Sequence, residues 1–153
     1  MQNTTARSSS IEQMQAEDII FALTEKILGT SLEKNKKIYL ADNVFTYIQP
    51  DFYSDERLII GEIFAHIGKP KKAQDNKIAN DILKMLLLEK ITGQHYRKVI
   101  VVCDAAEKKK LEGLSALAES IRQFGVEILM VDIDADLRTR LIEAQDRQKM
   151  TNA

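Results

Sequence analysis

Apolar residues follow two different spacings along the first part of the chain, and each change of spacing marks a change of predicted structure. Residues 11–28 and 73–91 have apolar positions at roughly helical spacing. Between them, residues 38–40 and 44–52 have an extended pattern, and residues 58–67 form an almost wholly apolar run after a polar turn. The pattern therefore predicts a helix, three strands and a second helix.

The second part of the chain alternates short apolar runs with amphipathic segments. Residues 99–103 and 126–131 are continuous apolar runs, typical of strands that are buried on both faces. Residues 114–124 and 136–149 have helical spacing. Alternating strands and helices indicate parallel strands with helices packed over them. We therefore expect an α/β fold with a mixed central β-sheet flanked by helices, in the order α-β-β-β-α-β-α-β-α.

Composition sets the expected domain limits and location. Residues 1–10 are rich in Asn, Thr and Ser, so we expect a disordered N-terminal tail followed by a single α/β domain over residues 11–150. A chain of 153 residues can form one core of useful size. It has one cysteine, Cys103, and no apolar run of membrane-spanning length. These features predict a cytoplasmic protein without membrane contact.

The charge balance limits the classes of partner. The formal net charge is −1, so nucleic-acid binding must depend on local basic patches such as Lys69, Lys71 and Lys72. None of the six glycines has the spacing of a dinucleotide or P-loop motif. Nucleotide-dependent chemistry is therefore not expected.

An acidic residue interrupts the apolar run at residues 58–67. Glu62 lies inside this run, and Asp51 lies on the preceding strand. A carboxylate in such a strand loses hydration, so it requires a cation or a hydrogen-bond donor. If the turn places Tyr53 opposite Leu58, the two acids lie diagonally on one face of the hairpin.

Two carboxylates on one face are a candidate metal site. Together with a backbone carbonyl and water they suit Mg²⁺ or Mn²⁺ better than zinc. A metal held in this way activates water and stabilises charge on phosphate oxygens. The hairpin therefore predicts phosphoryl chemistry.

The sequence Pro50-Asp51, followed by Glu62 on the next strand, resembles the motif of the PD-(D/E)XK nuclease superfamily. The predicted order of elements over residues 11–147 resembles the restriction-endonuclease-like core of that family. The resemblance implies metal-dependent phosphodiester hydrolysis of DNA by an endonuclease, with RNA as a further possible substrate. It also implies that Asp51, Glu62 and the Ile63 carbonyl are the metal ligands.

The same resemblance implies an additional acid and an oligomer. An acid from the first helix often assists the metal in this family, and Glu25 is the candidate ahead of Glu17 and Asp18. Proteins of this fold often act as dimers, so a homodimer or a place as a subunit of a larger complex is expected.

The family's lysine is expected two residues after the strand acid, and this chain has Phe64 there. Lys77, on the following helix, is the first substitute, because it shares a helical edge with Gln74. Lys69 is the second. Gln74 would orient water or phosphate, and His66 would act as a third ligand, a proton carrier or a phosphate contact.

Two other functions are open. A non-catalytic nucleic-acid- or protein-binding module of the same fold would account for Phe64 and the near-neutral charge. A small-molecule-binding α/β domain would use the strand ends at Cys103-Asp104 and Val131-Asp132. A nuclease should have a basic groove around the two acids, whereas a partner-binding module should have an apolar patch elsewhere.

Each candidate residue also has a purely structural alternative. Glu62 would then form an ion pair with a helix residue, and Asp51 would be an ordinary residue at a strand end. His66 would be a packing residue, and Lys77 would be a solvated helix lysine.

Overall fold

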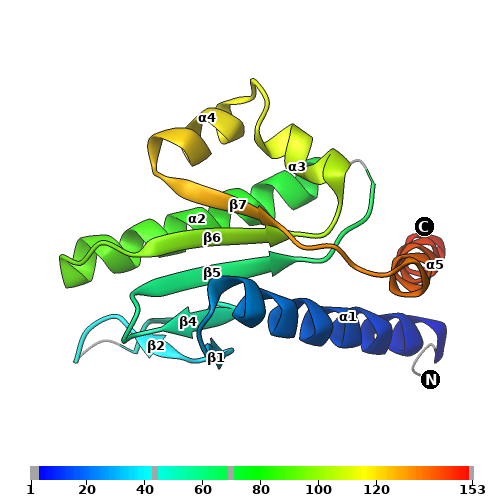
Figure 1. Ribbon diagram of the computed structural model, residues 1–153, viewed down its shortest axis with the longest axis horizontal. Helices are drawn as coiled ribbons and strands as arrows, with labels where there is room; N and C mark the ends of the chain where they lie inside the picture. The colour runs from blue at the N-terminus through cyan, green and yellow to red at the C-terminus, as the bar shows by residue number, and fades with distance from the viewer. Residues whose placement is uncertain (1–3, 43–44, 69–70, 152–153) are drawn as a thin grey trace.

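A mixed β-sheet of five strands forms the centre of the protein (Figure 1). The computed structural model describes residues 4–42, 45–68 and 71–151. Along the sheet the strand order is β1-β4-β5-β6-β7. Antiparallel pairing joins β1, β4 and β5, and parallel pairing joins β5, β6 and β7. The strands are β1 (Glu33–Lys34), β4 (Phe52–Ser54), β5 (Ile59–Phe64), β6 (Arg97–Val102) and β7 (Val126–Met130).

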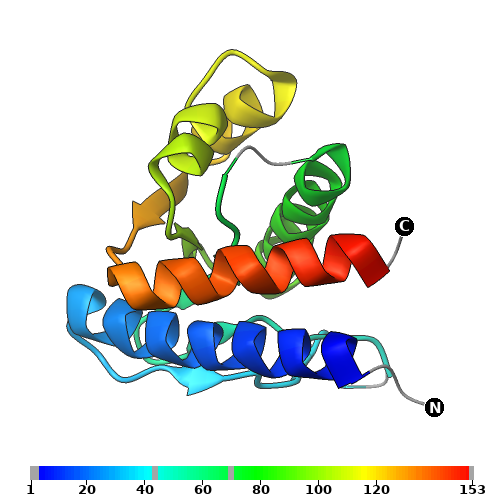
Figure 2. The same cartoon turned by 90° about the vertical axis from the view of Figure 1, so that its right-hand side faces the viewer.

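Helices cover both faces of this sheet. They are α1 (Thr4–Leu28), α2 (Lys72–Thr92), α3 (Ala105–Leu111), α4 (Ala116–Gln123) and α5 (Ala135–Thr151). One face is covered by α1 and α5, which lie side by side and run antiparallel (Figure 2). Arg147 of α5 forms an ion pair with Glu12 of α1 across this contact. The other face is covered by α2, α3 and α4. The prediction of an α/β fold with a mixed, helix-flanked sheet is therefore confirmed.

Alternation along β5 divides its side chains between the two faces. Ile60 and Phe64 belong to the core under α2, whereas Ile59 and Ile63 belong to the core under α1 and α5. Because successive residues of a strand point to opposite faces, Glu62 lies on the α2 face. The strand therefore delivers this acid to the same side of the sheet as the second helix.

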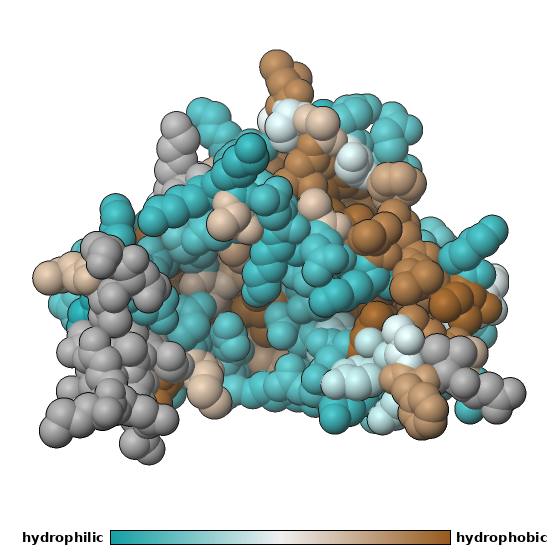
Figure 3. Space-filling model, turned by 180° about the vertical axis from the view of Figure 1, so that it is seen from behind, coloured by the Kyte–Doolittle hydropathy of each residue, from teal (hydrophilic) through white to brown (hydrophobic). Residues whose placement is uncertain are grey.

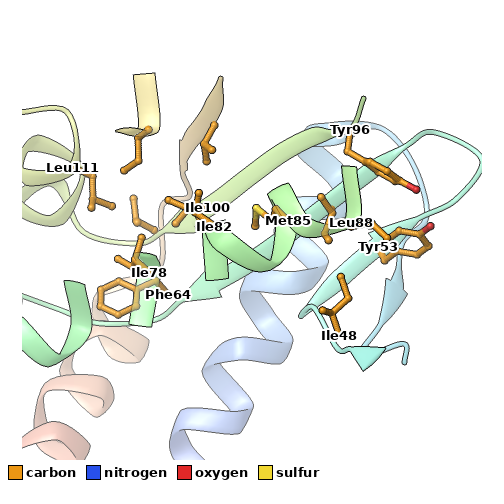
Figure 4. Packing of buried hydrophobic residues seen from close by; sticks show 14 of the residues in the cluster. Ile48, Tyr53, Phe64, Ile78, Ile82, Met85, Leu88, Tyr96, Ile100 and Leu111 are labelled. Atoms are coloured by element: carbon orange, nitrogen blue, oxygen red, sulfur yellow. The ribbon is translucent and has the colours of Figure 1, made fainter. Parts of the chain in front are cut away.

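The core under α2 is formed by residues at helical spacing. Ile78, Ile82, Met85 and Leu88 are each at most 4% exposed, and they pack toward the sheet around Ile100 (Figure 4). Burying such side chains stabilises the fold by roughly 1.5–3 kcal/mol each. This packing fixes the rotation of α2 about its axis and thereby places Asp81, whose charge acts on Glu62.

A small second sheet stands apart from the central one. It pairs β2 (Ile38–Tyr39) with β3 (Tyr47–Ile48) in antiparallel fashion. We expected one continuous strand over residues 44–52, but β3 and β4 are separate strands. The cause is the Gln49-Pro50-Asp51 segment, because proline cannot donate a hydrogen bond to a ladder.

Other boundaries also differ from the prediction. The first helix begins at Thr4, so the expected disordered tail over residues 1–10 is wrong from Thr4 onward. The sequence pattern also missed α3 and β1. The helix expected over residues 114–124 begins only at Ala116, because the Ser115 hydroxyl accepts the Ala118 N–H at 3.1 Å and caps it.

The outer side of α2 is also apolar. Leu83, Leu87 and Ile91 recur every four residues and are 64%, 40% and 45% exposed. Seen from the side opposite to Figure 1, apolar side chains gather on the surface formed by α2 and α4 (Figure 3). Among the described residues, no helix is long and apolar enough to cross a membrane.

Gly61 provides a test of the packing beside the predicted site. A Cβ atom on Gly61 would lie 1.9 Å from Cζ of the fully buried Phe52 ring. We expect Gly61→Ala to lower the free energy of unfolding by about 1–3 kcal/mol, because the ring has to leave its position. Urea denaturation monitored by circular dichroism measures this change.

The Phe52→Leu background is the control for this prediction. If the ring causes the cost, Gly61→Ala should be much less destabilising once the ring is removed. An equal cost in both backgrounds would contradict the steric explanation.

Candidate functional site

The β4–β5 hairpin differs from the prediction in register but not in the faces of its strands. Tyr53 lies opposite Ile60, whereas we expected it opposite Leu58, so the predicted register was wrong by two residues. The four-residue turn at 55–58 explains the shift, because Leu58 has a positive φ of 53° and belongs to the turn. A shift of two leaves every side chain on its predicted face.

The two predicted acids meet where the ladder ends. The last β4–β5 pair is Phe52 with Gly61, so the next position brings Asp51 level with Glu62 rather than diagonal to it. The Asp51 N–H donates to Glu62 Oε2 at 3.3 Å, and the Ile63 N–H donates to Asp51 Oδ2 at 2.7 Å. Side-chain oxygens therefore replace the backbone ladder at this point, and they hold the two carboxyl groups together.

Burial and mutual repulsion strongly perturb this pair. Burial raises the pKa of Glu62 to about 9, and the charge of Asp51, a side-chain hydrogen bond with Asp51 and the charge of Asp81 act in the same direction. Two neighbouring carboxylates cannot both ionise in a buried site without compensation. Without a cation the pair therefore keeps a proton at neutral pH, and a bound cation could take that proton's place.

Further charged groups surround the pair. Burial and the charge of Asp51 raise the pKa of Glu17 on α1, while Lys77 acts in the opposite direction. Burial also raises the pKa of Asp81 on α2, where Lys77 again lowers it and Asp51 raises it. The Asp51 carboxylate thus acts on Glu17 of α1 and on Asp81 of α2, and Lys77 opposes it at both, together with Lys34 at Glu17 and Lys84 at Asp81.

The first helix contributes a different acid from the one we preferred. Glu25 Oε2 accepts the Leu32 N–H at 2.8 Å, and this contact secures the chain just after α1. Glu17 lies eight residues earlier, about 12 Å along the helix axis. Its neighbours Ala16 and Ile20 are fully buried, so this part of α1 lies against the sheet. Glu17 therefore lies within electrostatic reach of Asp51, whereas the Glu25 carboxylate contacts the backbone after α1.

The remaining candidate residues lie in other surroundings. The Gln74 side chain accepts the Lys71 N–H at 2.7 Å and so caps the start of α2. His66 stacks on Phe64 with ring centroids 5.7 Å apart, and burial lowers its pKa against the effect of Asp104. His66 therefore belongs to the surroundings of Asp104 rather than to those of the carboxylate pair. The predicted Lys69 lies outside the described residues.

Phe64 occupies the family's lysine position as a core residue. It is 8% exposed and lies beside Ile78 on the α2 face (Figure 4). A lysine ammonium at this position would be buried among apolar side chains, which is costly. Lys77 precedes Ile78 on α2; its side chain is exposed, and its charge lowers the pKa of Glu17 and of Asp81.

The strand end that suggested a small-molecule site has a structural role. Asp104 is only 4% exposed, and Arg138 of α5 donates to it at 2.6 Å, while the Gly68 N–H donates at 3.1 Å. Although burial alone would raise the pKa of Asp104, these hydrogen bonds leave it below its usual value. Asp104 thus joins the end of β5 to α5 through an ion pair.

Comparison of the chain with protein-family models, curated proteins and solved structures gives no match. Within the described residues, no three His, Cys, Asp or Glu side chains are arranged as a metal-binding group. The fold and site define an α/β protein with a partly buried carboxyl pair at the end of an antiparallel ladder.

The raised pKa of Glu62 predicts a dependence of stability on pH. The folded protein binds a proton that the unfolded chain releases above its ordinary glutamate pKa, so this group lowers stability as the pH rises from about 4.5 toward 9. Glu62→Gln keeps the shape without the charge. We expect it to stabilise the protein at pH 8 by on the order of 1–3 kcal/mol, and by much less at pH 5.

Thermal and urea unfolding across pH 5–9 measure this difference in the absence of divalent metal. Glu25→Gln is the matched control, because its side chain can still accept the Leu32 N–H. Parallel curves for wild type and Glu62→Gln would show that Glu62 has an ordinary pKa.

Proposed function

We propose that the protein is a metal-dependent phosphodiesterase that cleaves nucleic acid, with DNA as the first substrate to test and RNA as the second. The observation that carries this proposal is the hydrogen-bonded pairing of Asp51 with Glu62, with Lys77 acting on the neighbouring acids Glu17 and Asp81. Two carboxyl groups held together offer oxygen ligands to a divalent cation, and a nearby ammonium can stabilise charge on a phosphate substrate. The proposed class is an endonuclease of the PD-(D/E)XK type.

Asp51 and Glu62 would hold Mg²⁺ or Mn²⁺, with the Ile63 carbonyl as a further ligand. The donor set fits, because these ligands are all oxygens and hard divalent cations prefer oxygen. Asp51 Oδ2 is held by the Ile63 N–H, which leaves the other oxygen of this carboxylate for a cation. When bound, the metal supplies an activated water and stabilises charge on phosphate.

Lys77 and Glu17 complete the proposed site. The Lys77 ammonium would stabilise negative charge that develops on the phosphate oxygens, which is the task of the missing strand lysine. Glu17 would assist from α1, either through water to the metal or by holding the attacking water. Both assignments use charges that already act on one another in the structure.

A non-catalytic binding module is the second candidate. Phe64 in the core favours it, because the usual lysine position cannot contribute to catalysis. The absence of a three-residue metal-binding group in the described part of the chain favours it too. In that case the carboxyl pair would be a remnant, and nucleic acid or a protein would bind without being cleaved.

Metal-dependent cleavage of labelled DNA and RNA tests the proposal directly. We expect cleavage with Mg²⁺ or Mn²⁺ and none with a chelator. Glu62→Gln and Asp51→Asn should abolish it, and Lys77→Ala should reduce kcat about 100-fold or more, since a charge-stabilising group is removed. Lys90→Ala is the matched control, because Lys90 is an exposed lysine in the last turn of the same helix.

One result would count against catalysis, and another against the role of Lys77. Wild-type protein that cleaves neither substrate with any divalent metal would favour the binding module. Equal activity of Lys77→Ala and Lys90→Ala would show that Lys77 does not take part in catalysis, and the proposed metal ligands would be unaffected by this result.

A second pair of variants distinguishes the two acids of α1. Glu17→Gln should raise the Mg²⁺ concentration for half-maximal activity about tenfold, because a group that supports the metal loses its charge. Glu25→Gln should leave it unchanged, since Glu25 contacts the Leu32 backbone. Mg²⁺ titrations of the activity of both variants measure this concentration. A larger effect of Glu25→Gln than of Glu17→Gln would favour Glu25 as the assisting acid.

The homodimer implied by the family resemblance stays a prediction. Light scattering coupled to size-exclusion chromatography measures it directly.

A further inference from the structure

The small β2–β3 sheet has one buried face and one exposed face. Ile38 pairs with Ile48, and Ile48 is 5% exposed and packs in the core under α2. The next pair, Tyr39 with Tyr47, points the other way, and these residues are 59% and 43% exposed. Their ring centroids are 5.6 Å apart. The core therefore anchors the sheet and leaves two aromatic rings side by side in solvent.

A lysine and a further exposed aromatic residue accompany this pair. Lys37 Nζ lies 5.0 Å from the centroid of the Tyr47 ring. Phe45, two residues before Tyr47 in the chain, is 96% exposed. The exposed aromatic residues Tyr39, Phe45 and Tyr47, together with Lys37, are called the aromatic platform below.

The aromatic platform has more exposed ring surface than the fold requires. The inner isoleucine pair suffices to attach the small sheet, whereas aromatic rings exposed to water contribute little to stability. Rings that stand free beside lysines are the surface on which proteins stack unpaired bases, and each stacked base contributes to affinity whatever its sequence. Double-stranded nucleic acid hides its base faces and cannot use such rings.

The aromatic platform is tied to the carboxyl pair by the chain and by hydrogen bonds. Tyr47 precedes Asp51 by four residues, so the two are at most about 14 Å apart along the backbone. The Asn35 N–H donates to the Asp51 carbonyl at 3.2 Å, and the Gln49 side-chain amide donates to the Asn35 carbonyl at 2.8 Å. Figure 1 shows β2 beside β4 at one end of the molecule. A base on the rings would thus lie a few nucleotides or less from the site.

We propose that the aromatic platform binds single-stranded nucleic acid and presents an adjoining phosphodiester to Asp51 and Glu62. Unpaired bases stack on Tyr39 and Tyr47, Phe45 extends the stack, and Lys37 contacts the backbone phosphates. This assignment rests on the proposed function for its choice of nucleic acid, and it narrows the substrate class to single strands or unpaired ends.

Binding is measured without cleavage, in chelator, by fluorescence anisotropy of labelled oligo(dT), oligo(U) and a duplex of equal length. We expect the single strands to bind at least tenfold more tightly than the duplex. Tyr39→Ala and Tyr47→Ala should each weaken single-strand binding about tenfold. Tyr47→Phe should bind almost as wild type, because it keeps the ring. Lys37→Ala should weaken binding and reduce its salt dependence.

Phe124→Ala is the matched control, since Phe124 is a 49% exposed aromatic residue at the C-terminal cap of α4, away from the aromatic platform. Thermal unfolding verifies that every variant is folded. The chain has four tyrosines and no tryptophan, so quenching of its intrinsic fluorescence by oligo(dT) gives a second readout. We expect strong quenching in wild type and much weaker quenching in Tyr39→Ala and Tyr47→Ala.

Folded Tyr39→Ala and Tyr47→Ala variants with wild-type affinity would overturn the proposal, and so would equal affinity for the duplex. The relative affinities for oligo(dT) and oligo(U) identify which nucleic acid is preferred. The two proposals can fail separately. If the wild-type protein cleaves no substrate but its binding of single strands depends on Tyr39 and Tyr47, the nuclease proposal is wrong and the binding proposal stands. If cleavage depends on Glu62 but binding does not depend on the two tyrosines, the binding proposal is wrong and the nuclease proposal stands.

Discussion

The contact between Asp51 and Glu62 is the constraint on which the rest of the site depends. Both carboxyl groups lie where the β4–β5 ladder ends, and the backbone N–H groups of Asp51 and Ile63 hold them in place. A partly buried pair of this kind is unfavourable unless it shares a proton or binds a cation. The fold therefore couples the stability of the hairpin to the charge on this pair.

Packing under α2 explains how the charged groups are distributed. The strand that carries Glu62 to the α2 face also carries Phe64, which packs in the core under α2. Lys77 precedes the buried Ile78 on the helix that covers this core, and its charge acts on Asp81 of the same helix. The core thus stays apolar while charged side chains lie along its edge.

The extent to which the site could be predicted differs from residue to residue. Glu62 was identifiable because an acid inside an apolar run is costly, and its shared face with Asp51 survived an error of two residues in register. The ranking of Glu25 above Glu17 stays a prediction: the weak helical periodicity of residues 11–28 does not show which part of α1 lies on the sheet, and in the structure Glu25 accepts the Leu32 N–H. The aromatic platform was missed for a similar reason: an overall aromatic content of 6% does not show that the exposed rings of Tyr39 and Tyr47 lie 5.6 Å apart.

The sequence by itself determined the mixed α/β architecture, most of the helices and the face on which each acid of the hairpin lies. These features follow from periodicities of two and 3.6 residues, which depend only on neighbours along the chain. The register of the hairpin, the separation of β2 and β3 from the central sheet, and the approach of Glu17 and Lys77 to the acids were decided by the tertiary structure. They depend on a turn with positive φ and on helices that pack against distant strands, and no local pattern contains that information.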